Sequence, residues 1–172
     1  MVSQHVEWMQ ASVIAWCELL MHSFHHWTGK HLVATDGEPE GRARRLFEAP
    51  FVVVSHGIEP DPVLNYGNRA ALALWELTWE ELRRTPSHRT AEAGNRDERA
   101  GMLARAEAHG YIADYRGVRI SRSGRRFLVE NAVVWNVMNG SLRVGQAATF
   151  SRWTYLDVVD SASTDAMNPD DR

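Results

Sequence analysis

Histidines near the start of the chain have a spacing that could bind a metal ion. His22 and His26 are four positions apart, so on a helix their imidazoles lie on one face, as a zinc or haem site needs. Glu18, one turn earlier, could supply a third ligand to zinc, but no fourth is visible in the sequence. We therefore favour packed or solvated histidines and keep a metal or haem site as the alternative.

A second group of residues has the types found in hydrolases. Ser55, His56 and Asp61 are close in sequence, but a catalytic serine needs a base held opposite it and donors for the oxyanion. Residues of one short loop rarely provide both. We expect His56 and Asp61 to bond the loop backbone, and we assign no catalytic residue.

A small enzyme that uses an interior cavity is kept as an alternative function. It would need a buried acid or base whose pKa is shifted. The interior-side candidates for this role are His88, Asp114 and Glu130.

Large aromatic side chains could form either a solid core or the wall of a pocket for a small planar ligand. Those that the predicted elements turn inward are Tyr66, Trp75, Trp79, Tyr115, Phe127, Trp135 and Phe150. The polar side chains expected to converge on the same interior are Asn65, Asn68, His88 and Gln146. When buried, these polar groups need partners, which a ligand or the backbone could supply. Together the two sets are the candidate ligand-binding residues.

The composition limits the classes of protein to which the chain can belong. Its 172 residues, 44% hydrophobic and 24% charged, suit one globular domain with a helical extension. The net charge of −3 gives no reason to expect nucleic acid or a membrane as partner. Cys17 is the single cysteine, which excludes an internal disulfide and favours a reducing compartment. Because the sequence has no recognisable signal peptide or spanning stretch, we expect a cytoplasmic protein.

Apolar residues recur at spacings of three and four through residues 6–27, the pattern of an amphipathic helix. The members of this stripe most suited to a contact are Val13, Trp16, Leu20 and Trp27. So much apolar surface must be covered, either by the chain's own domain or by a second copy. Because aromatic anchors are enriched in interfaces, we expect the stripe to mediate a homodimer.

The remaining elements follow in a simple order. After the helical residues 1–30 comes a linker over 31–46, with a short helix expected at 42–47. The predicted strands are 51–55, 63–66, 112–121, 126–137 and 142–153. This order predicts an α+β fold, in which helices are inserted between the second and third strands of a five-stranded antiparallel sheet. The acidic residues 157–172 lack periodicity and are expected to be disordered.

Arginines gather around the hairpin that joins the first two long strands. They are Arg116, Arg119, Arg122, Arg125 and Arg126. In a chain of otherwise balanced charge, we expect a solvated sheet edge or a partner contact here.

Several local sequences resemble the PAS fold. Residues 64–72, LNYGNRAAL, are similar to the junction between a strand and the first helix of the PAS pocket wall. Residues 77–82, LTWEEL, are similar to the turn that follows, and residues 121–127, SRSGRRF, resemble the hairpin between the long strands.

A narrower resemblance is to the bacterial MEKHLA domain, a relative of PAS domains. It rests on SHG at residues 55–57, DPVLNYGN at 61–68, LWEL at 74–77 and GQAA at 145–148. This resemblance covers residues 47–153, within a domain that we place at 47–156. It implies a PAS-like sensory or regulatory domain that is not catalytic and has no established ligand.

The resemblance also bears on cofactors. Photoactive flavin-binding PAS domains carry a cysteine on a central helix, and this chain has none in residues 47–153. Gln146 lies where those domains place a glutamine that contacts the flavin. Flavin binding without that photochemistry is therefore kept as an alternative.

Overall fold

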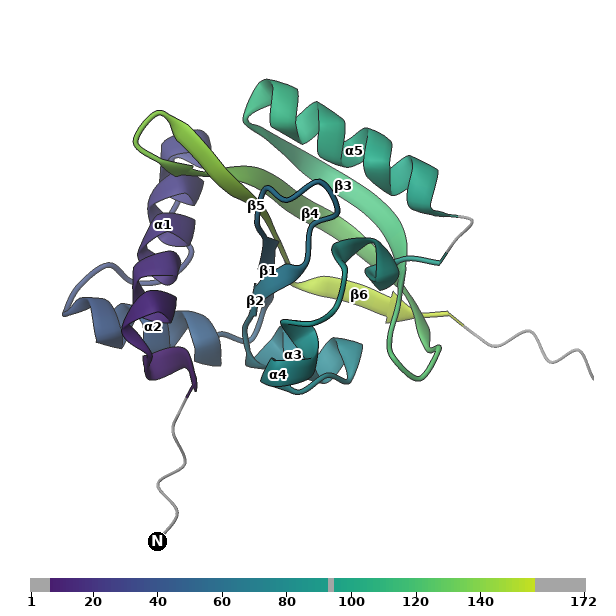
Figure 1. Cartoon of the computed structure of the whole chain (residues 1–172), viewed down its shortest axis with the longest axis horizontal. Coiled ribbons are helices and arrows are strands. Elements are labelled where there is room, and N and C mark those ends of the chain that lie inside the picture. The colour runs from purple at the N-terminus through teal and green to yellow at the C-terminus, as the bar shows by residue number, and fades with distance from the viewer. Residues whose placement is uncertain (1–6, 93–94, 157–172) are drawn as a thin grey trace, which may run out of the picture.

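The computed structural model describes residues 7–92 and 95–156, which form an antiparallel sheet with helices on both faces (Figure 1). The tail predicted to be disordered, 157–172, lies outside these ranges, as do the first residues of the predicted N-terminal helix. In the described ranges, no helix has the length and apolar character needed to cross a membrane.

The sheet has the strand order β2-β1-β5-β4-β3, and every pairing is antiparallel. Its strands are β1 Val52–His56, β2 Leu64–Gly67, β3 Tyr111–Ile120, β4 Arg126–Asn139, β5 Leu142–Phe150 and β6 Arg152–Tyr155. Because β6 pairs with β4 after β5 has ended, the last predicted strand is divided at Ser151. The α+β fold with helices between the second and third strands is confirmed.

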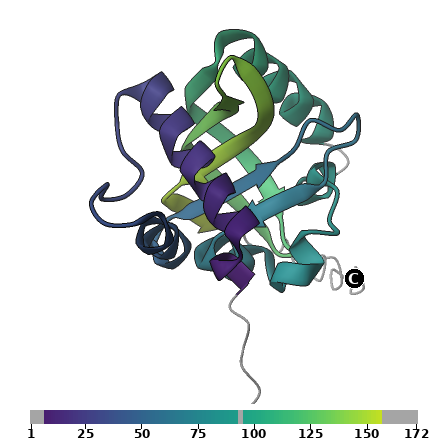
Figure 2. The same ribbon diagram turned by 60° about the vertical axis from the view of Figure 1, so that its left-hand side comes forward.

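The helices lie on both faces of this sheet. They are η1 Glu7–Met9, α1 Ala11–Thr28, α2 Pro39–Glu48, α3 Arg69–Trp75, α4 Trp79–Leu82, η2 Ser87–Thr90 and α5 Arg96–His109. α1 crosses one face of the sheet, whereas α5 runs along the opposite face (Figures 1 and 2). α2 begins at Pro39, so helical structure starts inside the predicted linker and earlier than expected.

Asn68 holds the junction between the sheet and α3. Its side-chain oxygen accepts from the backbone N–H of Ala71 (3.1 Å) and of Val53 (3.0 Å). Its side-chain nitrogen donates to the carbonyls of Leu46 (3.1 Å) and Phe51 (2.7 Å). Asn68 is completely buried, so every bond of this predicted pocket residue is used to cap a helix and join three segments.

The stripe of α1 packs against the chain's own sheet. Leu20 is fully buried and Val13 nearly so, in a core that includes Tyr66 and Trp135. The ring of Phe24 meets that of Trp135 edge to face, with 5.0 Å between centroids.

Two polar bonds fix α1 on the strands. The indole N–H of Trp16 donates to Ser55 Oγ (2.9 Å), and that of Trp27 donates to the carbonyl of Asn136 (2.9 Å). The four residues expected at a dimer contact are therefore used within the chain. The sequence left open whether the chain's own domain or a second copy covers this apolar stripe. In the structure, the chain's own sheet covers it.

Candidate ligand-binding site

A pocket lies between the other face of the sheet and the helices α3, η2 and α5. Its volume is about 70 Å³. The sheet supplies its floor, and Trp75, Ser87, Thr90, Met102 and Leu103 come from the helices that cover it. Most of the wall is apolar, so any polar group in it is conspicuous.

The pleat of the strands decides which side chains reach the floor. Val54 and His56 on β1 line the pocket, whereas Val53, the residue before Val54, packs in the α1 core. Across the ladder, Val54 is paired with Ala148 and His56 with Gln146, and these two β5 residues also line the pocket.

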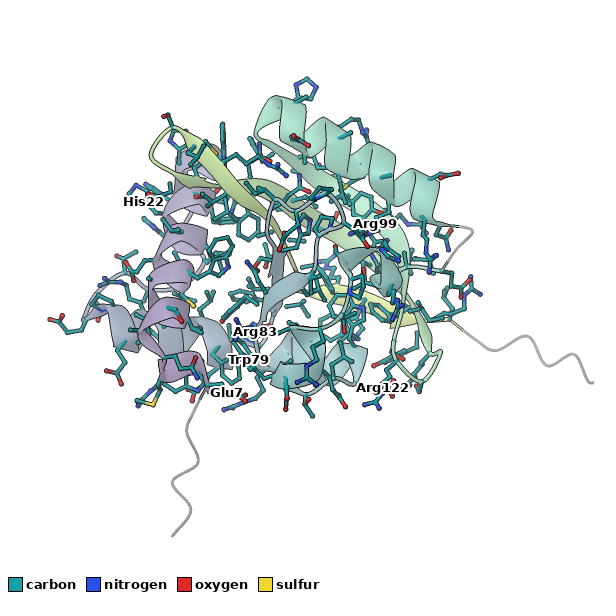
Figure 3. All side chains as sticks on the ribbon, in the orientation of Figure 1. Glu7, His22, Trp79, Arg83, Arg99 and Arg122 are labelled. Atoms are coloured by element: carbon teal, nitrogen blue, oxygen red, sulfur yellow. The ribbon has the colours of Figure 1, made fainter. Side chains whose placement is uncertain are left out.

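Two arginines reach this pocket from opposite sides. Arg99 on α5 and Arg119 on β3 are each 8% exposed, and Figure 3 shows Arg99 on the side of α5 that faces the sheet. Arg99 donates to Ser87 Oγ; Arg119 donates to the Val118 carbonyl (2.9 Å) and to the Tyr115 hydroxyl (3.0 Å). Among residues 7–92 and 95–156, neither guanidinium forms an ion pair with a carboxylate.

The two charges act on each other. Burial, and after it the positive charge of Arg119, lower the pKa of Arg99 to about 10. Arg99 stays protonated at neutral pH, because this value is still well above 7. The pocket wall thus carries two positive charges, and the carboxylates of the described residues do not neutralise them.

Two uncharged groups of the wall also lack partners. His56 Nδ1 lies 2.7 Å from the Gly57 carbonyl and must donate to it, which leaves Nε2 as an acceptor. This Nε2 and the indole N–H of Trp75 are buried without a hydrogen-bond partner in the described part of the chain. Burial lowers the pKa of His56, so its ring is neutral at pH 7 and Nε2 offers a lone pair to the pocket.

The predicted ligand-binding residues divide between pocket and core. Four of them line the pocket: Trp75, Tyr115, Gln146 and Phe150. Gln146 donates its Nε2 to the carbonyl of Leu103 (3.1 Å) and so ties the sheet to α5.

The other predicted residues lie elsewhere for identifiable reasons. Tyr66, Trp79 and Trp135 pack in the core under α1, because their strand parity or helix face turns them there. Asn65 accepts from Ser55 Oγ (2.7 Å), which in turn accepts from Trp16 on that same side.

Two further candidates are near the pocket without lining it. Phe127 belongs to the hydrophobic core beside the pocket but not to its wall. His88, which is partly exposed, approaches Asp61 with its Nδ1 at 3.0 Å. Asp61, expected to bond its own loop, is therefore paired with η2 instead.

The arginines are the residues that sequence reasoning missed. Arg119 was expected at a solvated sheet edge or a partner contact, but it is buried because it has the same strand parity as the inward Tyr115. Arg99 is three positions before Met102 and seven before Ala106, both buried, which is the spacing of one helix face. Strand parity for Arg119 and helical spacing for Arg99 are the sequence signals that could have identified them as buried.

The metal and enzyme alternatives receive no support from the geometry. His22 and His26 are exposed on α1, and Figure 3 shows His22 pointing away from the sheet. Glu18, the proposed third ligand, is instead paired with Arg42 (2.9 Å). In the described ranges, no group of three or more His, Cys, Asp or Glu side chains is placed to hold a metal ion.

The acids proposed for an enzyme also lie outside the pocket. Asp114 is exposed, and Glu130 is paired with Arg116 at 3.4 Å on the outer side of the hairpin. Neither Asp114, Glu130 nor His88 lines the cavity.

The pocket is small for a flavin ring in this arrangement. The cavity of about 70 Å³ compares with roughly 300–1,000 Å³ for usual small-molecule pockets. Gln146 is already bonded to Leu103. Cys17 lies in the core under α1, on the opposite face of the sheet, where burial raises the pKa of its thiol to about 12.

Solved structures of PAS and LOV domains share this fold. A PAS domain from Colwellia psychrerythraea matches with a TM-score of 0.57 and 12% identity, over 69% of this chain and 95% of that chain. An RNA-binding light-oxygen-voltage receptor matches with a TM-score of 0.56 and 23% identity, over 74% of this chain and 36% of that chain. A light-oxygen-voltage domain studied with a flavin analogue matches with a TM-score of 0.54 and 12% identity, over 68% of this chain and 85% of that chain. Identities this low show the fold alone.

Sequence comparison reaches a plant protein and a domain family. The homeobox-leucine zipper protein REVOLUTA of Arabidopsis thaliana is 23% identical over 141 residues, which are 78% of this chain but only 17% of that protein. The pattern that defines the MEKHLA domain matches residues 14–155, and so includes most of α1 as well as the predicted range. The resemblance noted in the sequence is confirmed, and the chain belongs to the MEKHLA domain family.

Proposed function

We propose that this PAS-like sensory domain works by binding a small molecule in the pocket between its sheet and α5, without a catalytic step. The observation that carries the proposal is the pair of guanidinium groups, Arg99 and Arg119, that the fold buries beside a cavity without a carboxylate partner in the described residues. Burying a charge without a partner is unfavourable, and a ligand that pairs with it offsets that cost.

The pocket is placed where a ligand could change the position of a helix. α5 is joined to the sheet by few polar contacts: Leu103 with Gln146 (3.1 Å), Glu107 with Asn136 (3.0 Å) and Glu107 with Arg143 (3.5 Å). A ligand between α5 and the floor would add contacts to both. Occupancy would therefore bias the position of α5, which is the property a sensory domain needs.

A thermal-shift screen with a pocket-filling variant tests this proposal. Small neutral, anionic and cationic compounds are added separately to the full chain and to Ala148→Leu, whose side chain enters the floor. We expect one class to raise the melting temperature of the unaltered chain and not that of Ala148→Leu. Ala104→Leu, on the exposed side of α5, is the matched control and should respond like the unaltered chain. No stabilisation by any class contradicts the proposal.

Homodimerisation is a second, separate proposal. Since Val13, Trp16, Leu20 and Trp27 are used within the chain, a dimer through α1 would use its outward face, where Ala15 is exposed. Sedimentation of the full chain across a range of concentrations tests this. A dimer that Ala15→Arg converts to a monomer supports it, and a monomer at every concentration contradicts it.

A further inference from the structure

We infer that the pocket takes a small monocarboxylate, with its carboxylate between Arg99 and Arg119 and its carbon chain against the apolar wall. This inference rests on the proposed ligand-binding function and names the class of ligand.

Charge complementarity selects an anion. The wall holds two guanidinium groups and the indole N–H of Trp75. The residues that line the cavity include no aspartate or glutamate. A cation would meet two like charges, and a neutral compound would leave them unpaired.

The donors left over suit a carboxylate. Each guanidinium has five N–H donors in a planar fork. In the described residues, Arg99 gives one hydrogen bond, to Ser87, and Arg119 gives two, to Val118 and Tyr115. Donors therefore remain on both sides of the pocket for the two oxygens of one carboxylate.

The size of the pocket limits the rest of the molecule. One water molecule needs roughly 10–15 Å³ of cavity volume. If each non-hydrogen atom of a ligand takes about as much, the cavity of about 70 Å³ admits roughly four to seven such atoms. Apolar side chains of Met102, Leu103, Val134 and Phe150 surround this space. A chain of two or three carbons would use that wall, whereas inorganic phosphate would not.

His56 adds a preference within this class. Its Nε2 is a buried acceptor on the pocket floor without a partner in the described ranges. A hydroxyl on the ligand's carbon chain could donate to it. We therefore expect a hydroxylated carboxylate, such as 3-hydroxybutyrate, to bind more tightly than butyrate.

The test compares ligands of matched shape by calorimetric titration of the full chain at constant ionic strength. The probes are sodium butyrate, sodium 3-hydroxybutyrate, n-butanol, n-butylammonium chloride and sodium phosphate. We expect binding of both carboxylates and none of butylammonium. Replacement of one guanidinium, in Arg99→Gln or Arg119→Gln, should weaken butyrate binding about tenfold or more.

Exposed arginines on the same elements provide the controls. Arg105→Gln on α5 and Arg116→Gln on β3 should leave the affinity for butyrate unchanged. Arg99→Lys keeps the charge but loses the fork, and it should lie between the unaltered chain and Arg99→Gln. Circular dichroism of each variant shows whether it is folded.

The outcomes separate the inference from the proposed function. Binding of n-butanol but not butyrate would keep the pocket and overturn the carboxylate. Binding of phosphate alone, or butyrate binding that Arg99→Gln and Arg119→Gln leave unchanged, would also overturn it. Failure of every probe, together with no hit in the thermal-shift screen, would overturn both.

Discussion

The two faces of the sheet differ in what they bury. Under α1, apolar and aromatic side chains such as Leu20, Phe24 and Trp135 interlock, and two indole N–H groups are bonded. Under α5, the same strands border a cavity with two buried guanidinium groups. Each face has a buried indole N–H without a partner in the described residues, so the charges are what distinguish the second face. The face under α1 is thus an apolar core, and the face under α5 borders a cavity with two guanidinium groups that have no carboxylate partner in the described residues.

The largest effect should come from the α1 face. Leu20→Ala removes a fully buried side chain there and is expected to cost about 2–5 kcal/mol, because the lost transfer free energy and the new cavity add. Urea denaturation measures the free energy of unfolding. Leu142→Ala, at a position that is 65% exposed, is the control and should change it by no more than about 0.5 kcal/mol. Equal effects at the two positions would contradict the docking of α1.

Substitutions of two neighbouring alanines on β5 compare the two faces of the sheet directly. Both alanines border the cavity, but Ala147 packs in the α1 core, whereas Ala148 is paired with Val54 and Val134 on the pocket floor. Ala147→Leu should overpack the core and cost about 1–3 kcal/mol, while Ala148→Leu has cavity space to occupy and should cost less. The same urea experiment checks this. If Ala148→Leu were the more damaging of the two, the cavity would not be where we place it.

Removal of a pocket charge should stabilise the protein in the absence of ligand. Arg99→Met takes away a buried cation that has no carboxylate partner in the described residues and that lies near Arg119. We expect a gain of about 1 kcal/mol. Arg105→Met, on the exposed side of α5, should be nearly neutral. A clear loss of stability in Arg99→Met alone would mean that Arg99 holds the fold together rather than serving a ligand.

The smallest effect concerns pH and again belongs to the pocket face. Because burial lowers the pKa of His56 below its ordinary 6.5, the unfolded chain binds this proton at a higher pH than the folded chain does. The contribution to stability is therefore present above pH 6.5 and is lost as the pH falls towards the folded pKa. His56→Gln should flatten the fall in melting temperature between pH 7 and pH 5, and the exposed His22→Gln should not. An unchanged slope in His56→Gln would refute the burial of a neutral imidazole.

Local patterns predicted much of the fold. The hairpin predicted from Asn139-Gly140 joins β4 to β5, with a two-residue loop at Gly140-Ser141 and Gly140 at a φ of 62°. Thr78 and Glu81 form the expected capping box at the start of α4. These features depend on a few adjacent residues, and that is why the sequence was sufficient.

The site was harder to predict, because it depends on which face of the sheet each residue meets. Tyr66 and Trp135 could be identified as interior, but whether they met α1 or α5 depended on register and on where α1 docked. Arg119 belongs to a run of exposed arginines, and only its parity with Tyr115 separates it from them. Charged residues are so seldom buried that composition favoured the wrong answer for it.

Amide chemical shifts of the full chain, titrated with sodium butyrate, test the central difference between the faces most directly. We expect changes at Arg99 and Met102 on α5, at Arg119 on β3 and at His56 on β1, with Leu20 and Phe24 on α1 unaffected. Changes confined to α1, or none at any butyrate concentration, would contradict it.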